Sequence, residues 1–290
     1  MSRPVYAIPP SFKNDNLDCN SIIKYLKYLE DKDASRVLTT AGTSQFNLLS
    51  LEEVYCLNKC IVQNFNKEKI LGLPILSTKH LLEEIKKLNN LNATNTKILI
   101  LFPERYYSDE QILEFFTKVC QFSNYPVYVH GNVLRKGRGG VYEYSNQLLE
   151  KLSNIDNFEG MKEEYSSLDL AIKNIQNLDL DIIVAGGSMR RFWTLNPFGA
   201  NSFLTGVGNF NPQHSENFYT HYKLGHYEDC LDIIKNTENP LFKVFMKNGW
   251  HASMRESLKH MGYILEDRKP FITLSDTEKE EIIKSLNKII

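Results

Sequence analysis

A lysine at the end of an apolar run is the residue with the clearest potential for chemistry in this sequence. Lys162 follows the run at residues 158–161 and stands where a polar segment begins. A neutral lysine amine can act as a nucleophile, whereas most lysines are solvated surface charges. The choice between these two roles depends on where the fold places Lys162.

A second strand-like run, at residues 126–131, is followed by further polar residues. The period of two along a strand places Tyr128, His130 and Asn132 on one face. Tyr128 lies earlier in the run and is expected one layer deeper, where it packs in the core and its hydroxyl group finds a buried partner.

Two turns rich in small residues could bind an anion. In the first, Gly42 allows a close approach, and the hydroxyl and backbone N–H groups of Thr43 and Ser44 could hold a carboxylate. The second runs from Gly186 into a pair of arginines and could be a phosphate site. Ordinary turns, with the arginines solvated, are the alternative.

The elements that must position these residues form a regular alternation. Short apolar or β-branched runs recur, each followed by a segment with helical periodicity, which is typical of βα units around a parallel sheet. The clearest helices, each with a serine at or near its start, are predicted at residues 50–64, 77–88, 108–122 and 168–177. The strands are predicted at residues 5–8, 36–41, 69–73, 97–102, 126–131, 157–162, 181–185 and 203–207.

This pattern predicts an α/β protein, a (β/α)8 TIM barrel with additional C-terminal helices. Residues 1–212 would form the barrel through the eighth strand, and residues 213–290 the eighth helix and a helical extension of the same structural domain. The last helix is expected from Ser275, because Ser275 and Glu278 form a capping box. Chemistry in such a barrel occurs at the carboxyl ends of the strands.

The composition excludes several classes of protein. A net charge of -1 with mixed signs argues against a nucleic-acid surface or an anionic membrane. Five scattered cysteines indicate neither a disulfide framework nor a zinc cage, so we expect a soluble cytoplasmic protein. The histidines show no metal-ligand spacing, so no metal is expected.

The order and spacing of the motifs resemble those of the pyruvate-dependent class I aldolases, the dihydrodipicolinate synthase and N-acetylneuraminate lyase family, over nearly the whole chain. The turn at residues 42–44 is similar to the family's glycine-threonine-threonine turn, and residues 160–163 to its run of glycine, hydrophobic residue, Schiff-base lysine and acidic residue. Residues 199–212 resemble its glycine-alanine block, and residues 268–271 its arginine-proline-leucine step.

The resemblance implies a carbon-carbon or carbon-oxygen lyase or synthase in which Lys162 forms a Schiff base with pyruvate or a related 2-oxo acid, without a separate cofactor. It also implies a homo-oligomer, dimer or tetramer, because many members borrow a tyrosine from a neighbouring subunit. The counterparts of the remaining site residues would be Thr43 and Ser44 for the substrate carboxylate, Arg135 for a second carboxylate, Gly186 and Leu204 for the pyruvate pocket, and Tyr107 for the borrowed tyrosine.

The sequence departs from the family pattern at two places. His130 stands where the family carries a catalytic tyrosine, and Gln45-Phe46 follow the turn where the family continues with glycine-glutamate. An imidazole titrates near pH 6.5 and can donate or accept a proton, so His130 could replace the phenol as general acid and base. The alternative is a non-catalytic or altered barrel that binds a 2-oxo acid or sugar acid.

Overall fold

The computed structural model describes residues 3–40, 46–74, 77–101, 105–136 and 139–290. These residues divide into two compact units, one formed by Glu68–Leu204 and the other by Arg3–Lys67 together with Thr205–Ile290. In the part of the chain that is described, no helix is both long and apolar enough to span a membrane.

The unit Glu68–Leu204 contains parallel strands that pair in chain order, with each strand next to the one before it. Most of their residues are buried, as expected for strands covered on both faces. The runs at residues 68–74, 96–101 and 181–184 are rich in isoleucine, leucine and valine. The strands are β5 (Glu68–Pro74), β6 (Thr96–Leu101), β7 (Val127–Gly131), β10 (Phe158–Glu163), β11 (Asp181–Val184) and β12 (Ser202–Phe203).

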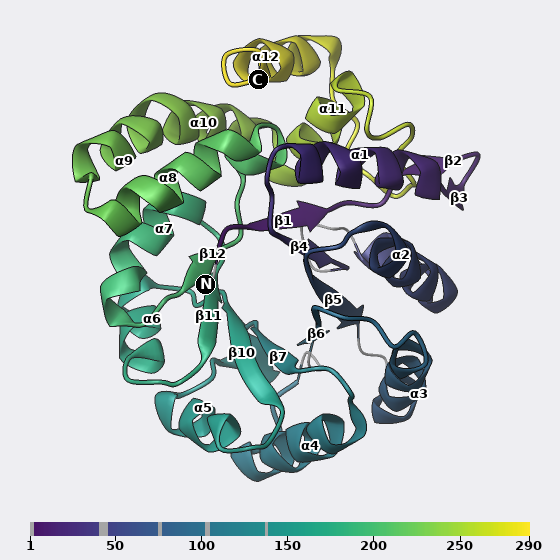
Figure 1. Ribbon diagram of the computed structural model, residues 1–290, viewed down its shortest axis with the longest axis vertical. Helices are drawn as coiled ribbons and strands as arrows, with labels where there is room; N and C mark the ends of the chain where they lie inside the picture. Colours follow the sequence, from purple (N-terminus) through teal and green to yellow (C-terminus); the bar gives the residue numbers. More distant parts are fainter. Residues whose placement is uncertain (1–2, 41–45, 75–76, 102–104, 137–138) are drawn as a thin grey trace. The chain divides into compact units, whose positions relative to one another are not determined.

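Helices of this unit lie outside the strands that they follow (Figure 1). They are α3 (Thr78–Asn89), α4 (Asp109–Phe122), α5 (Asn146–Ser153), α6 (Leu168–Ile175) and α7 (Ser188–Leu195), with a short 3-10 helix η3 (Asn196–Phe198). In each of the first four, a serine hydroxyl accepts a hydrogen bond from the backbone N–H three residues later. A hairpin of β8 (Leu134–Lys136) and β9 (Gly140–Tyr142) follows β7.

The second unit contains the parallel pair β1 (Val5–Ile8) and β4 (Arg36–Thr39), and the hairpin β2 (Phe12–Lys13) and β3 (Asn16–Leu17). The capping box predicted at Ser275 and Glu278 begins its last helix. Its helices are α1 (Cys19–Asp31), η2 (Phe46–Leu48), α2 (Leu51–Asn64), η4 (Val207–Asn209), α8 (Pro212–Leu224), α9 (Tyr227–Ile233), η5 (Ile234–Glu238), α10 (Asn239–Asn248), α11 (Trp250–His260) and α12 (Asp276–Leu286).

The eight parallel strands and the helices that follow them confirm the predicted fold class, a (β/α)8 TIM barrel with additional C-terminal helices. The eighth strand, predicted at residues 203–207, is wrong in extent. The eighth strand ends at Phe203, and residues 207–209 form the 3-10 helix η4. Thr205 explains the early end, because its hydroxyl oxygen accepts a hydrogen bond from the backbone N–H of Gly208 at 3.0 Å and closes a turn.

Candidate active site

Lys162 and His130 occupy paired positions on the neighbouring parallel strands β10 and β7. Both side chains are almost completely buried, with 3% of each residue exposed. Lys162 Nζ lies 2.7 Å from His130 Nε2. The alternation of side chains along both strands therefore brings together the two residues that the sequence singled out.

Glu164 completes the cluster from the position just after β10. Its Oε2 atom accepts a hydrogen bond from Lys162 Nζ at 2.6 Å and lies 2.7 Å from His130 Nε2. The Glu164 side chain is 41% exposed, so it links the two buried groups to solvent. We refer to Lys162, His130 and Glu164 as the triad. Asn132 extends it, with Nδ2 at 3.0 Å from His130 Nδ1.

The surroundings of the triad favour a neutral imidazole and an ionised carboxylate. Burial, and then the charge of Lys162, lower the pKa of His130 from 6.5 to about 4, although Glu164 opposes this shift. Burial tends to raise the pKa of Glu164, but the hydrogen bond with His130 and the charge of Lys162 outweigh it and hold that pKa well below its usual range.

The tautomer of His130 determines whether its Nε2 atom forms a hydrogen bond with Glu164 or with Lys162. A neutral imidazole carries one proton, so Nε2 either donates to Glu164 or accepts from Lys162, but not both. Asn132 fits both arrangements, because its side-chain amide offers an acceptor and two donors to Nδ1. When the proton is on Nε2, His130 donates to Glu164. When the proton is on Nδ1, Nε2 instead accepts from Lys162.

Acid should destabilise the protein through His130. Between pH 6.5 and about 4 the unfolded chain binds a proton on this imidazole and the folded protein does not, so stability falls as pH falls through that window. At pH 5 the loss should be about 1–2 kcal/mol. We expect His130→Asn to reduce the difference in unfolding free energy between pH 7 and pH 5 by that amount, measured by urea denaturation. An unchanged difference would argue against a neutral buried His130.

A buried ion pair holds the strand that carries Lys162. Glu163 is 0% exposed and accepts hydrogen bonds from Arg191 Nε at 2.9 Å, from Arg191 Nη2 and from the backbone N–H of Tyr165 at 2.8 Å. Arg191 lies on α7, so this bidentate pair fastens α7 to the end of β10. Arg191 thus binds a carboxylate of its own chain, which argues against the phosphate role considered from the sequence.

Tyr128 has the structural role predicted for it. Its ring is fully buried, and its hydroxyl group accepts from Lys97 Nζ at 2.8 Å and donates to Asp181 Oδ2 at 2.9 Å. A Cβ atom on Gly160 of β10 would lie 2.2 Å from the Tyr128 ring atom Cε1. The glycine before Met161 and Lys162 therefore makes room for this ring.

The other site residues predicted from the sequence lie at several different places. Leu204 is 8% exposed, and its N–H donates to the carbonyl of Val184 at 2.8 Å. Gly186 has a φ of 70° in the exposed turn before α7. Tyr107 is 70% exposed, and Arg135 is an exposed residue of β8. Thr43 and Ser44 lie outside the described residues, and their predicted role remains untested.

Comparison with known proteins identifies the family. A family model described as the dihydrodipicolinate synthetase family matches residues 5–289. The chain belongs to this family.

Similar proteins of the dihydrodipicolinate synthetase family cover almost the whole chain. A 4-hydroxy-tetrahydrodipicolinate synthase from Rickettsia bellii (strain OSU 85-389) is 23% identical over 297 residues, 98% of this chain and 96% of its own. One from Archaeoglobus fulgidus is 23% identical over 98% of this chain and 97% of its own. The N-acetylneuraminate lyase structure from Fusobacterium nucleatum has a TM-score of 0.87 at 15% identity, covering 100% of this chain and 99% of that one. These likenesses confirm the family resemblance and the fold.

The family motif around Lys162 does not point to Glu164. The resemblance drew attention to Glu163, the acidic residue directly after the lysine, but the structure turns Glu163 towards Arg191. The signal for Glu164 was the period of two, because residues 162 and 164 of an extended segment share a face. The same period of two places Tyr128 and His130 on one face of their strand.

Proposed function

We propose that the protein is a lyase or synthase of the aldolase type that forms a Schiff base between Lys162 and pyruvate or a related 2-oxo acid. The observation that supports this most strongly is the triad: a buried lysine amine within 2.7 Å of an imidazole nitrogen and 2.6 Å of a carboxylate oxygen. A small-molecule substrate and no separate cofactor follow from this chemistry, since the lysine supplies the covalent group.

The first step needs an unprotonated amine. The proton that leaves the Lys162 ammonium has two acceptors at hydrogen-bond distance, His130 Nε2 and Glu164 Oε2. Because Glu164 is 41% exposed, its carboxylate can pass the proton to water. The amine nitrogen then attacks the ketone carbon of the 2-oxo acid, a C–N bond forms as the C=O double bond becomes single, and the oxygen takes the proton that the nitrogen loses, which gives a carbinolamine.

The second step removes water from the carbinolamine. His130 can hold on Nε2 the proton that it takes from Lys162 in the first step. The resulting imidazolium donates this proton to the departing hydroxyl group, the C–O bond breaks, water leaves, and the neutral imidazole and an iminium remain. The iminium withdraws electrons from the neighbouring carbon, which allows a C–H or C–C bond at that carbon to form or break. His130 would therefore perform the proton transfer that the family assigns to a tyrosine.

One observation favours a second candidate function, a binding protein without turnover. The carboxylate of Glu164 accepts a hydrogen bond from Lys162 Nζ at 2.6 Å and lies 2.7 Å from His130 Nε2, so the three side chains can satisfy one another as a structural network. Such a protein would bind the anionic 2-oxo acid without forming a covalent bond.

Borohydride trapping distinguishes the two functions. We expect the full-length protein incubated with pyruvate and sodium borohydride to gain the mass of one reduced adduct, measured by intact-mass spectrometry over a panel of 2-oxo acids. Lys162→Ala should gain none, whereas Lys118→Ala, at an exposed position on α4, should react like the wild type.

No adduct with any 2-oxo acid, combined with binding detected by calorimetry, would favour the binding protein.

We also propose a homo-oligomer, a dimer or tetramer, because Tyr107 exposes 70% of its surface and the family resemblance places its counterpart beside a second subunit. Size-exclusion chromatography with light scattering measures this directly.

A further inference from the structure

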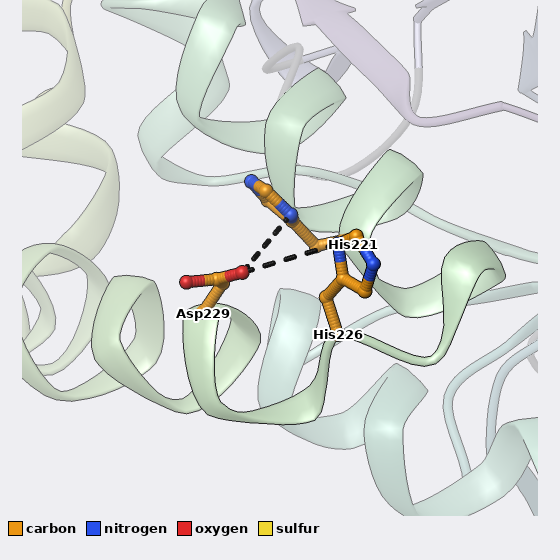
Figure 2. A group of neighbouring side chains, drawn as sticks. All are labelled: His221, His226 and Asp229. Atoms are coloured by element: carbon orange, nitrogen blue, oxygen red, sulfur yellow. Dashed lines mark ion pairs between the residues drawn. The ribbon is translucent and has the colours of Figure 1, made fainter.

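The corner between α8 and α9 brings three potential metal ligands together. His221 lies in the last turn of α8, His226 immediately precedes α9, and Asp229 lies in the first turn of α9. Figure 2 shows the Asp229 carboxylate facing both histidines. One ligand atom from each residue lies within 4.8 Å of the other two.

The backbone fixes this arrangement. Gly225 ends α8 with a φ of 76°, the left-handed conformation that glycine adopts readily. The N–H of His226 then donates to the carbonyl of His221 at 2.9 Å, and the N–H of Gly225 to the carbonyl of Tyr222 at 3.2 Å. This is the hydrogen-bond pattern of a Schellman motif. It holds the two histidines together although four residues separate them in the sequence.

The His221 imidazole has an unsatisfied polar atom that faces the cluster. Its Nδ1 atom is buried and has no hydrogen-bond partner within the described residues. The nearest opposite charge is Asp229 Oδ2 at 3.4 Å, and the same oxygen lies 4.0 Å from His226 Nδ1. Two ligands at about 2.0–2.1 Å from a tetrahedral ion are roughly 3.3–3.4 Å apart. The first separation therefore suits a shared ion already, and the second would have to shorten by movement of the exposed His226 ring.

We propose that His221, His226 and Asp229 bind a divalent first-row transition metal ion, with zinc as the best match. Two imidazole nitrogens and one carboxylate oxygen suit zinc, nickel or copper better than magnesium or calcium. Three protein ligands leave a fourth position for water. Spacing along a single helix could not reveal this site, because its ligands lie at the end of α8 and at the start of α9, on either side of a glycine.

This proposal does not depend on the proposed function. All three ligands belong to the unit that contains α8 and α9, and Lys162, His130 and Glu164 belong to the other unit. An ion bound at this corner would link α8 to α9 and, because the unfolded chain lacks the preformed site, would raise the unfolding temperature in a zinc-dependent manner.

Equilibrium dialysis of the full-length protein against zinc, with metal analysis, tests the proposal. We expect about one zinc ion per chain, and a loss of roughly tenfold or more in affinity in His226→Ala and in Asp229→Asn. Both residues are exposed, with 55% and 60% of their side chains accessible, so these variants should fold normally. His260→Ala, at an exposed position on α11, should bind zinc like the wild type.

A second arm separates this site from the thiols, which also bind zinc. Cys60→Ser removes a buried thiol that interacts with Cys19 and should leave zinc binding unchanged. Loss of zinc in Cys60→Ser, retention in both His226→Ala and Asp229→Asn, or no binding by the wild type would overturn the proposal. Zinc should also raise the melting temperature of the wild type and not that of Asp229→Asn.

Discussion

Replacing His130 with asparagine should lower the rate of pyruvate methyl-proton exchange by roughly 10²–10⁴-fold, the usual contribution of a general acid or base. Exchange requires the iminium to lose and regain a proton at the neighbouring carbon. Asparagine keeps a polar side chain of similar size but cannot carry the proton. The decay of the methyl signal in D2O, followed by nuclear magnetic resonance, measures the rate.

His130→Tyr provides the matched variant, since the family resemblance places a tyrosine at this position. We expect it to exchange faster than His130→Asn, because a phenol can carry the proton and asparagine cannot. Trapping of pyruvate by borohydride should persist in His130→Asn, because Lys162 remains, but it should be slower, because His130 also donates the proton that forms the iminium. Equal exchange rates in wild type and His130→Asn would contradict the proton-transfer role of His130.

Replacing Arg191 with methionine should destabilise the protein by about 3–5 kcal/mol, the usual result of breaking a buried ion pair. The change leaves the Glu163 carboxylate, which is 0% exposed, without the guanidinium that donates to both of its oxygens. The carbonyl of Tyr165 also loses a donor at 3.0 Å. Urea denaturation of the two proteins at one pH measures the difference.

Lys118→Met is the control for this prediction, because Lys118 is an exposed residue of α4 and takes no part in the ion pair. We expect it to change the free energy of unfolding by no more than about 0.5 kcal/mol. Glu163→Gln in the Arg191→Met background should recover part of the loss, since it removes the uncompensated charge. An Arg191→Met variant as stable as Lys118→Met would show that the pair contributes little.

The meeting of Lys162 and His130 could be predicted from the sequence because it follows from simple geometry. The alternation of strands and helices orders the strands, and the period of two decides which residues face the same way. Glu164 follows from the same rule, but the family motif directed attention to Glu163. The partner of Glu163, Arg191, could not be predicted, because their contact depends on where α7 begins relative to β10.

The eighth strand and the α8–α9 corner show where local patterns fail. Residues 203–207 are mostly apolar and read as a strand, but the Thr205 hydroxyl group bonds to the backbone of Gly208 and turns the chain. The spacing of His221 and His226 in the sequence does not predict that they meet. Their proximity depends on the left-handed conformation of Gly225. Sequence motifs for metal ligands describe only the spacing of residues and do not include such a turn.

The position of the borohydride-trapped pyruvate tests the central claim most directly. After reduction, digestion and mass spectrometry of the wild-type protein, we predict the added mass on the peptide that contains Lys162 and on no other lysine. An adduct that maps to a different lysine, or one that persists in Lys162→Ala, would contradict the claim that the buried amine beside His130 and Glu164 is the nucleophile.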